Sequence, residues 1–406
     1  MFVSVARLCV CLVFMFAFAP VASAQEWAGR WASSPAGHLA FVPQDEAGQR
    51  TVLQVIDPDG RLAPAEEVAR KASGPAVALG PRGDVVVAWT DREHRLWMRY
   101  RPAGGTMGAP EQVASGVDTF VESSPVGLDG AGTATFAWVP RTRSFDGGIS
   151  VRSRAESGAW SAPQNLPGLN VYRPQLAVTG NGSAVLTWAQ SKTTRRPNDR
   201  QIAISARSPG GVFSAPQIVA GTQRRAGVPV VDANDRGDAA VLWVELHRNT
   251  LSVHGSFRAP GGRFGARVAL SRIKDVAGRR VTVMPDGRMI LRWTDHETNR
   301  LEARTRAPDG TLSPPRVLTN RLELNSSIST LAIGEGAIAW REHNRGTTTV
   351  RIASAAGGRL GQARVIARTR STIRSEPAFA VTPSGLSMVL KPPERIGDRI
   401  RWTRIS

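Results

Sequence analysis

The chain has 406 residues and a formal net charge of +19, and all but four of its 52 basic residues are arginine. Such a charge attracts anionic partners, and the attraction weakens as salt rises. A chain of this length seldom forms one core without repetition or division into domains. Both cysteines and the longest apolar run lie near the N-terminus. The composition therefore excludes a disulfide-stapled scaffold and a multispanning membrane protein.

Residues 1–24 have the pattern of a secretory signal peptide. Arg7 precedes the apolar stretch from Leu8 to Phe18, and small residues stand at Ala22 and Ala24. We expect cleavage after Ala24, which removes both cysteines and, with Arg7, lowers the net charge from +19 to +18. The alternative is an uncleaved N-terminal anchor. The mature protein is predicted to be secreted or held in the cell envelope, with no further membrane span.

A short apolar strand ending in tryptophan recurs along the mature chain with spacings of 47 to 55 residues. The recurring tryptophans are Trp89, Trp138, Trp188, Trp243, Trp293 and Trp340, with Phe41 heading the series and Leu390 closing it. Repetition on this scale is typical of solenoids and propellers. Because the tryptophan keeps one place on an apolar strand, we expect it to pack in the core rather than to stack on sugars.

Each repeat predicts four short strands separated by glycine or proline turns. In one repeat they are Pro75–Leu79, Val85–Trp89 and Leu96–Arg101, and the fourth strand has an Ala-Pro-Gln pattern like that at Ala215–Val219. The first two strands are apolar on both faces and the third alternates with arginine, so they run from a buried axis to a wetter rim. We predict an all-β propeller of four-stranded antiparallel blades formed by residues 25–406 as one domain.

Eight blades are the preferred count, and seven with a composite closing blade is the alternative. The last repeat ends with Ile400–Ile405, which has the pattern of a third strand and leaves no fourth. The segment from Trp27 to Trp31 has two possible places. It supplies the missing outer strand of the last blade, or it is the inner strand of the first.

The turn between the third and fourth strands resembles the Asp-box hairpin of secreted bacterial sialidase-like propellers. Ser205–Phe213 and Ser153–Trp160 keep the serine, glycine and aromatic residue of that hairpin, and Asp309 is the nearest match to its aspartate. The resemblance implies blade architecture and not activity. Sialidases use an arginine trio, a Tyr–Glu pair and an aspartate. Tyr172-Arg173-Pro174 is similar to one of their motifs, but their catalytic residues are otherwise not recognisable.

Other reactive residue types gather in the loop after the tryptophan strand, including Glu245, His247, Asp295, Glu342 and His343. We expect these to be solvated turn residues, because loops of different blades do not converge as metal ligands must. The segment from Asp232 to Asp238 resembles a calcium loop. Its Arg236 stands where an oxygen ligand is required, so we expect a turn. We predict no metal site, no cofactor and no nucleic-acid motif.

Basic residues concentrate in the connections from the outer strand of one blade to the inner strand of the next. They are Arg173, Arg224, Arg225, Arg272, Lys274, Arg279, Arg280, Arg321, Arg368, Arg370 and Arg374. The neighbouring loops before the third strand add further basic residues, Arg200 among them. Since these connections approach the axis, we expect several guanidinium groups around one mouth, where they bind carboxylate, sulfate or phosphate.

The sequence therefore predicts a secreted, monomeric, non-catalytic binding or scaffold protein. Its expected partner is an anionic polymer, such as an acidic glycan or envelope polymer, or an acidic protein. The alternative is a sialidase-like hydrolase or lyase that acts on glycans through the same arginine-rich face.

Overall fold

Among the residues that it describes, the structure, a computed structural model, contains 32 β-strands. It describes residues 31–34, 37–44, 50–118, 125–142, 147–193, 199–220, 225–247, 250–295, 297–322, 328–331, 336–344, 347–355, 358–369, 378–382, 385–391 and 401–405. The predicted signal peptide and its cleavage site lie outside these residues.

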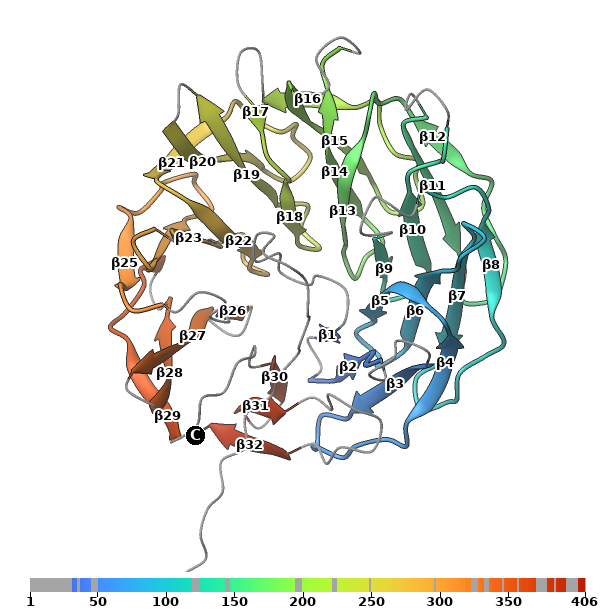
Figure 1. The fold of residues 1–406 in the computed structure, drawn as a ribbon, viewed down its shortest axis with the longest axis horizontal. Coiled ribbons are helices and arrows are strands. Elements are labelled where there is room, and N and C mark those ends of the chain that lie inside the picture. Colours follow the sequence, from blue (N-terminus) through green and yellow to red (C-terminus); the bar gives the residue numbers. More distant parts are fainter. Residues whose placement is uncertain are drawn as a thin grey trace, which may run out of the picture.

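The strands form eight antiparallel sheets, each built from consecutive segments of the chain (Figure 1). The first four sheets contain β1 (Trp31–Ser33), β2 (Leu39–Phe41), β3 (Arg50–Ile56) and β4 (Glu66–Arg70); β5 (Ser73–Leu79), β6 (Val85–Thr90), β7 (Leu96–Arg101) and β8 (Glu111–Ala114); β9 (Val126–Leu128), β10 (Ala134–Trp138), β11 (Ile149–Arg154) and β12 (Gln164–Leu166); and β13 (Tyr172–Val178), β14 (Ala184–Ser191), β15 (Arg200–Arg207) and β16 (Gln217–Ala220).

The remaining four sheets follow in the same chain order. They contain β17 (Arg225–Ala226), β18 (Val230–Ala233), β19 (Ala239–His247), β20 (Thr250–Arg258) and β21 (Val268–Ile273); β22 (Val276–Val283), β23 (Met289–Asp295), β24 (Arg300–Arg306) and β25 (Arg316–Thr319); β26 (Ile328–Leu331), β27 (Ala337–Asn344), β28 (Thr347–Ser354) and β29 (Arg364–Thr369); and β30 (Ala378–Thr382), β31 (Gly385–Lys391) and β32 (Arg401–Ile405).

The sheets stand around a common centre, an arrangement consistent with a β-propeller (Figure 1). The innermost strands are β1, β5, β9, β13, β18, β22, β26 and β30, and each of them contacts the next in this order. Strand order within a sheet then runs outward in chain order, as the predicted gradient from buried to half-exposed strands requires.

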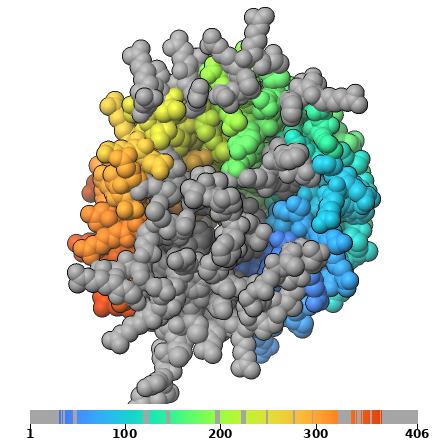
Figure 2. Space-filling view, in the orientation of Figure 1, coloured from blue at the N-terminus to red at the C-terminus, as the bar shows by residue number. Residues whose placement is uncertain are grey.

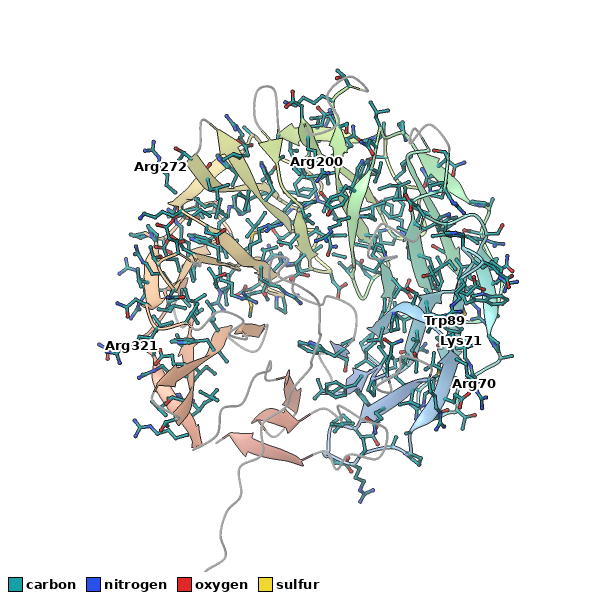
Figure 3. All side chains as sticks on the ribbon, viewed as in Figure 1. Arg70, Lys71, Trp89, Arg200, Arg272 and Arg321 are labelled. Atoms are coloured by element: carbon teal, nitrogen blue, oxygen red, sulfur yellow. The ribbon has the colours of Figure 1, made fainter. Side chains whose placement is uncertain are left out.

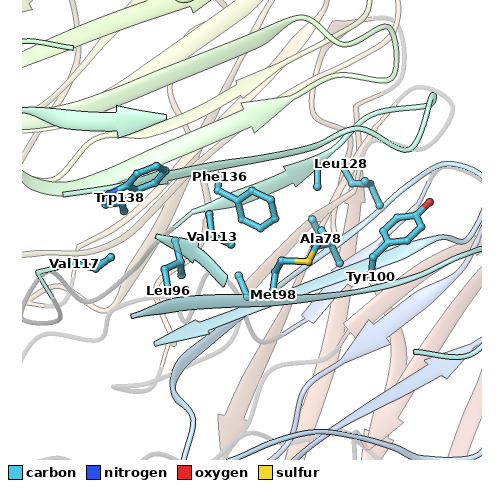
Figure 4. Packing of buried hydrophobic residues seen from close by; sticks show 12 residues of the cluster. Ala78, Leu96, Met98, Tyr100, Val113, Val117, Leu128, Phe136 and Trp138 are labelled. Carbon is cyan, nitrogen blue, oxygen red and sulfur yellow. The ribbon is translucent and has the colours of Figure 1, made fainter. Parts of the chain in front are cut away.

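The hydrophobic core lies between neighbouring sheets. Trp188, Trp243, Trp293 and Trp340 have no exposed surface. Figure 4 shows the layer between the second and third sheets, where Phe136 of β10 packs with Met98 and Leu96 of β7. Burying both faces of each inner strand removes apolar surface from water, which is the main source of stability in a core of this kind. The prediction that the recurring tryptophans are core residues is confirmed.

The first repeat differs from the predicted alignment in two ways. Trp31 pairs with Phe41, so the segment at Trp31 is the inner strand of the first sheet and not the outer strand of the last. Phe41 lies four residues after the turn glycine Gly37, whereas Trp89 lies six residues after Gly83. Phe41 is therefore not the counterpart of the tryptophans. Trp27 lies outside the described residues.

The predicted Ala-Pro-Gln pattern of the fourth strand has a structural role between sheets. Gln217 of β16 donates from Nε2 to the carbonyl of Phe264, 2.6 Å away in the next sheet. Glu111 of β8 likewise accepts from Arg154 at 2.7 Å and from the indole of Trp160 at 3.1 Å. In the first four sheets the repeated glutamine or glutamate thus connects the outer strand to the following hairpin.

Candidate functional site

The structure separates the predicted basic residues into an inner and an outer group. Arg173 lies on β13 and Arg279 and Arg280 lie on β22, both innermost strands, whereas Arg272 and Arg368 lie on the outer strands β21 and β29. Lys274 directly follows β21 and Arg321 lies two residues after β25, and Figure 3 shows Arg272 and Arg321 at the outer edge of the ring. Arg225 lies on β17, which pairs with β19. Arg224, Arg370 and Arg374 lie outside the described residues.

Two arginines converge on one tyrosine at the start of β13. The Cζ atom of Arg173 lies 5.1 Å from the ring centroid of Tyr172, and that of Arg200, the first residue of β15, lies 4.2 Å from it. All three side chains are partly exposed. Guanidinium groups at these distances are attracted to the face of the ring. The sequence predicts that the loop at Arg200 neighbours the connection that carries Arg173, but no pattern in it indicates that Tyr172 joins them.

The backbone of Arg173 is strained. Its φ angle is +47°, and the pairing of β13 with β14 shifts register between Tyr172 and Gln175. In the second sheet the matching position, also followed by proline, is Gly74, with a φ angle of +54°. Glycine adopts this conformation freely, whereas a residue with a side chain meets a steric penalty. Strain of this kind is concentrated at functional sites.

The inner strands β18 and β22 of the next two sheets carry a further charged pair. Arg280 of β22 is exposed, and Arg279 donates a hydrogen bond to the carbonyl of Val228. Asp232 of β18 accepts a hydrogen bond of 2.8 Å from the backbone of Val283. Burial raises the pKa of Asp232 to about 6, although that hydrogen bond and the charge of Arg280 oppose the rise. β13 contacts β18, and β18 contacts β22. Asp232 lies near the end of β18, whereas Tyr172 and Arg173 begin β13.

Several acids expected to be solvated are buried, and that expectation is wrong. Glu245, Asp295 and Glu342 are 0%, 5% and 9% exposed. Glu245 accepts a hydrogen bond of 3.0 Å from the indole of Trp243, and Glu342 accepts one of 3.1 Å from Trp340. An acid two residues after the tryptophan points to the same side of the strand, so this spacing was a usable signal.

The one Ser–His–acid grouping around Glu245 does not have the geometry of a catalytic triad. Nε2 of His254 lies 2.8 Å from Ser252 Oγ and 3.6 Å from Glu245 Oε2. A triad needs the serine and the acid on different ring nitrogens, and here both lie at the same one. Among the described residues, no three His, Cys, Asp or Glu side chains are placed to hold a metal ion.

The segment that resembles a calcium loop forms a hydrogen-bonded turn. Asn234 accepts from the backbone of Asp238 at 3.0 Å and donates to its carboxylate at 3.0 Å and to the carbonyl of Met284 at 2.8 Å. Asp309, the nearest match to the Asp-box aspartate, accepts from the backbone of Thr311 at 2.8 Å. These polar groups are used in turns and in contacts between sheets, as turn chemistry predicts.

No protein-family model matches the chain, and no curated protein matches it. Among solved structures, the chain is similar to the BP39L lectin from Burkholderia pseudomallei, with a TM-score of 0.56 and 12% identity over 84% of this chain and 99% of the lectin. Lower TM-scores are found for the polysaccharide lyase Uly1 (0.47, 10% identity, 89% and 92% covered) and the microbial sialidase Hz136 (0.38, 11% identity, 77% and 73% covered). The likeness to the lectin shows a shared fold.

Helices long and apolar enough to cross a membrane are absent from the described residues.

Proposed function

We propose that this protein is a secreted, non-catalytic glycan-binding propeller that recognises an acidic glycan at the inner-strand site formed by Tyr172, Arg173 and Arg200. The observation that carries the proposal is the pair of guanidinium groups held against one tyrosine ring. Guanidinium groups bind carboxylates in bidentate fashion and remain charged at every physiological pH. A uronate or sialate carboxylate is therefore the expected ligand group.

Tyr172 serves in this proposal to position the two arginines. A free arginine loses much side-chain entropy when it binds a ligand, and holding it beforehand reduces that cost. The strained backbone of Arg173 fits the same idea, since a glycine would suit the fold better and would remove the guanidinium. Arg280, exposed on β22, adds positive charge to the same inner wall and favours the approach of an anion.

The scaffold is proposed to be one eight-bladed domain spanning residues 25–406, with β30–β32 as a closing blade of three strands. A shared fold with a lectin agrees with glycan binding, although the residues of the site rather than the fold support the choice of ligand. We further propose that the protein is monomeric and exported by its N-terminal signal, with cleavage after Ala24. N-terminal sequencing of protein recovered from the culture medium tests the export.

Binding of polygalacturonate by the purified mature protein, measured by calorimetry over a salt titration, tests the ligand class. We expect binding that weakens with salt and is lost in Arg200→Gln and Arg173→Gly, with no release of sugar. Arg272→Gln, a change of one arginine at the rim, is the matched control and should bind as the wild type does. Neutral galactan should not bind.

Equal binding of the neutral and acidic polymers would refute an anionic site. If Arg272→Gln loses as much affinity for polygalacturonate as the site variants do, the overall charge of the protein, and not this cluster, accounts for the binding. If the protein releases sugar from the polymer and a single carboxylate substitution abolishes this activity, the protein is a glycan-active enzyme and the proposal of a non-catalytic role is wrong.

A further inference from the structure

Exposed apolar side chains gather on one part of the rim. Among the described residues, six large hydrophobic side chains are exposed, and four of them lie one each on β16, β21, β25 and β29. They are Ile218, Val268, Val317 and Val365, with exposed fractions of 45%, 37%, 44% and 37%. These strands are the outer strands of four consecutive sheets, the fourth to the seventh. Scattered exposed hydrophobics are ordinary, but a repeated row indicates an interaction surface.

The first three sheets are polar at the matching part of the rim. Their outer strands carry Glu67, Gln112 and Asn165 there. Glu67 pairs with Arg50 at 2.8 Å, and Asn165 accepts a hydrogen bond of 2.7 Å from Ser150. The repeat therefore does not require an apolar residue at this position. Isoleucine or valine occupies it in the fourth, sixth and seventh sheets, whereas in the fifth sheet the matching residue is Ala269 and Val268 lies one residue earlier on the strand.

Of the four outer strands that carry these exposed apolar residues, β21, β25 and β29 also carry basic residues. Their sequences contain no aspartate or glutamate, and they include Arg272 and Arg368, both exposed. Figure 3 shows Arg272 at the outer edge of the ring. A second copy of this chain would bring the same positive charge to the contact and would be repelled. Charge complementarity selects an acidic partner.

The backbone geometry indicates the shape of that partner. Each of the four strands ends the strand order of its sheet, so one of its edges pairs with no other described strand. Such an edge presents N–H and C=O groups ready to pair with an extended chain. Natural proteins protect edges with polar and charged side chains, as the first three sheets do here, whereas β-branched apolar residues favour pairing.

We propose that the apolar rim, formed by Ile218, Val268, Val317 and Val365 with Arg272 and Arg368, binds an acidic polypeptide segment in extended conformation. The segment adds as a further strand to an outer strand, so that main-chain hydrogen bonds give affinity, and alternate apolar and acidic side chains meet valines and arginines. This surface lies at the opposite edge of the sheets from β13, which carries Tyr172 and Arg173, although Arg200 lies on β15, next to β16. The proposal does not depend on the proposed glycan binding.

Fluorescence anisotropy of a labelled peptide of alternating glutamate and valine, titrated with the full mature protein, tests the proposal. A block peptide of the same composition and a peptide of alternating lysine and valine are the control ligands. The variant I218T/V268T/V317T/V365T keeps the β-branched shape and removes the apolar surface. The control variant Q112A/N165A alters the polar part of the rim. Thermal melting verifies that each variant is folded, and Arg272→Gln provides a second test through charge alone.

We expect the alternating acidic peptide to bind about tenfold more tightly than the block peptide, and to bind about tenfold more weakly to the four-threonine variant. Arg272→Gln should weaken it too, while Q112A/N165A should not. Equal binding of the two acidic peptides, or no loss in the four-threonine variant, would overturn the proposal. Concentration-dependent dimers abolished by the threonines would also overturn it, because a second copy would then be the occupant. If the four-threonine variant binds polygalacturonate as the wild type does, the peptide site and the proposed glycan site are independent of each other.

Discussion

Gln164 of β12 and Phe213 of the fourth sheet exchange two hydrogen bonds. Gln164 Nε2 donates to the carbonyl of Phe213 at 2.6 Å, and the backbone N–H of Phe213 donates to Gln164 Oε1 at 2.8 Å. One side chain thus satisfies both backbone groups of a buried residue in the neighbouring sheet. The glutamine that recurs in the sequence is explained by this contact and not by ligand binding.

Replacement of Gln164 by alanine should lower the free energy of unfolding by about 1–3 kcal/mol, because two hydrogen bonds are lost and buried backbone groups are left without partners. Urea denaturation followed by tryptophan fluorescence measures the change. Gln112→Ala on the exposed side of β8 is the control and should leave the midpoint unchanged. A loss of equal size in both variants would contradict the role assigned to Gln164.

Arg173→Gly should leave the free energy of unfolding unchanged or raise it by up to about 1 kcal/mol, since relief of the left-handed strain offsets the entropy of glycine. Gly74→Ala, at the matching position, should lower it by about 1 kcal/mol. Thermal melting of both variants provides the measurement. A strongly destabilised Arg173→Gly protein would mean that the arginine stabilises the fold, and the strain would then offer no support for the binding site.

The stability of the protein should depend on pH through Asp232. Because the folded pKa is raised to about 6, the folded state binds a proton more tightly than the unfolded chain does. This contribution to stability is complete below a pH of about 4 and disappears as the pH rises through about 6. Asp232→Asn keeps an acceptor for the backbone of Val283 and should be more stable than the wild type at pH 7.5 but not at pH 4. Parallel pH-dependence of the two proteins would argue against Asp232 as the source.

Glu245 should affect the pH dependence of stability in the opposite direction to Asp232. Its burial favours the neutral acid, but hydrogen bonds from Trp243 and Arg267 and the nearby His254 outweigh burial and lower the pKa of its carboxyl. A lowered folded pKa gives stability that is present above the unfolded value and is lost as the pH falls through the folded one.

Glu245→Ala should therefore lower the free energy of unfolding at neutral pH by about 3 kcal/mol, because Arg267 and the indole of Trp243 lose a buried partner. The measurement is urea denaturation, and the difference from the wild type should shrink in acid. Glu93→Ala is a suitable control, because Glu93 is an exposed acid in the turn that follows the tryptophan strand β6 of the second sheet. Its unfolding midpoint should stay within experimental error of the wild type.

The sequence by itself determined the repeat, the order of strands within each sheet and the buried place of the tryptophans. Those features follow from local patterns. Two-sided apolar strands must be covered on both faces, and alternating strands need only one covered face. The place of Trp31–Ser33 was open in the sequence, since a short strand with a tryptophan fits an inner or an outer position equally well.

Only the tertiary structure decided which charged residues meet. The predicted arginines occupy neighbouring positions in the repeat, but a connection between blades runs from the rim to the axis, so Arg272 and Arg173 lie at opposite edges of their sheets. Tyr172 and Arg200 come together across β14, and although the sequence predicts the order of these strands, it does not predict that the arginine lies over the tyrosine ring. The indole partners of Glu245 and Glu342 lie two residues away on the same strand, so the sequence contained part of this signal, whereas Arg267, the further partner of Glu245, comes from outside that strand.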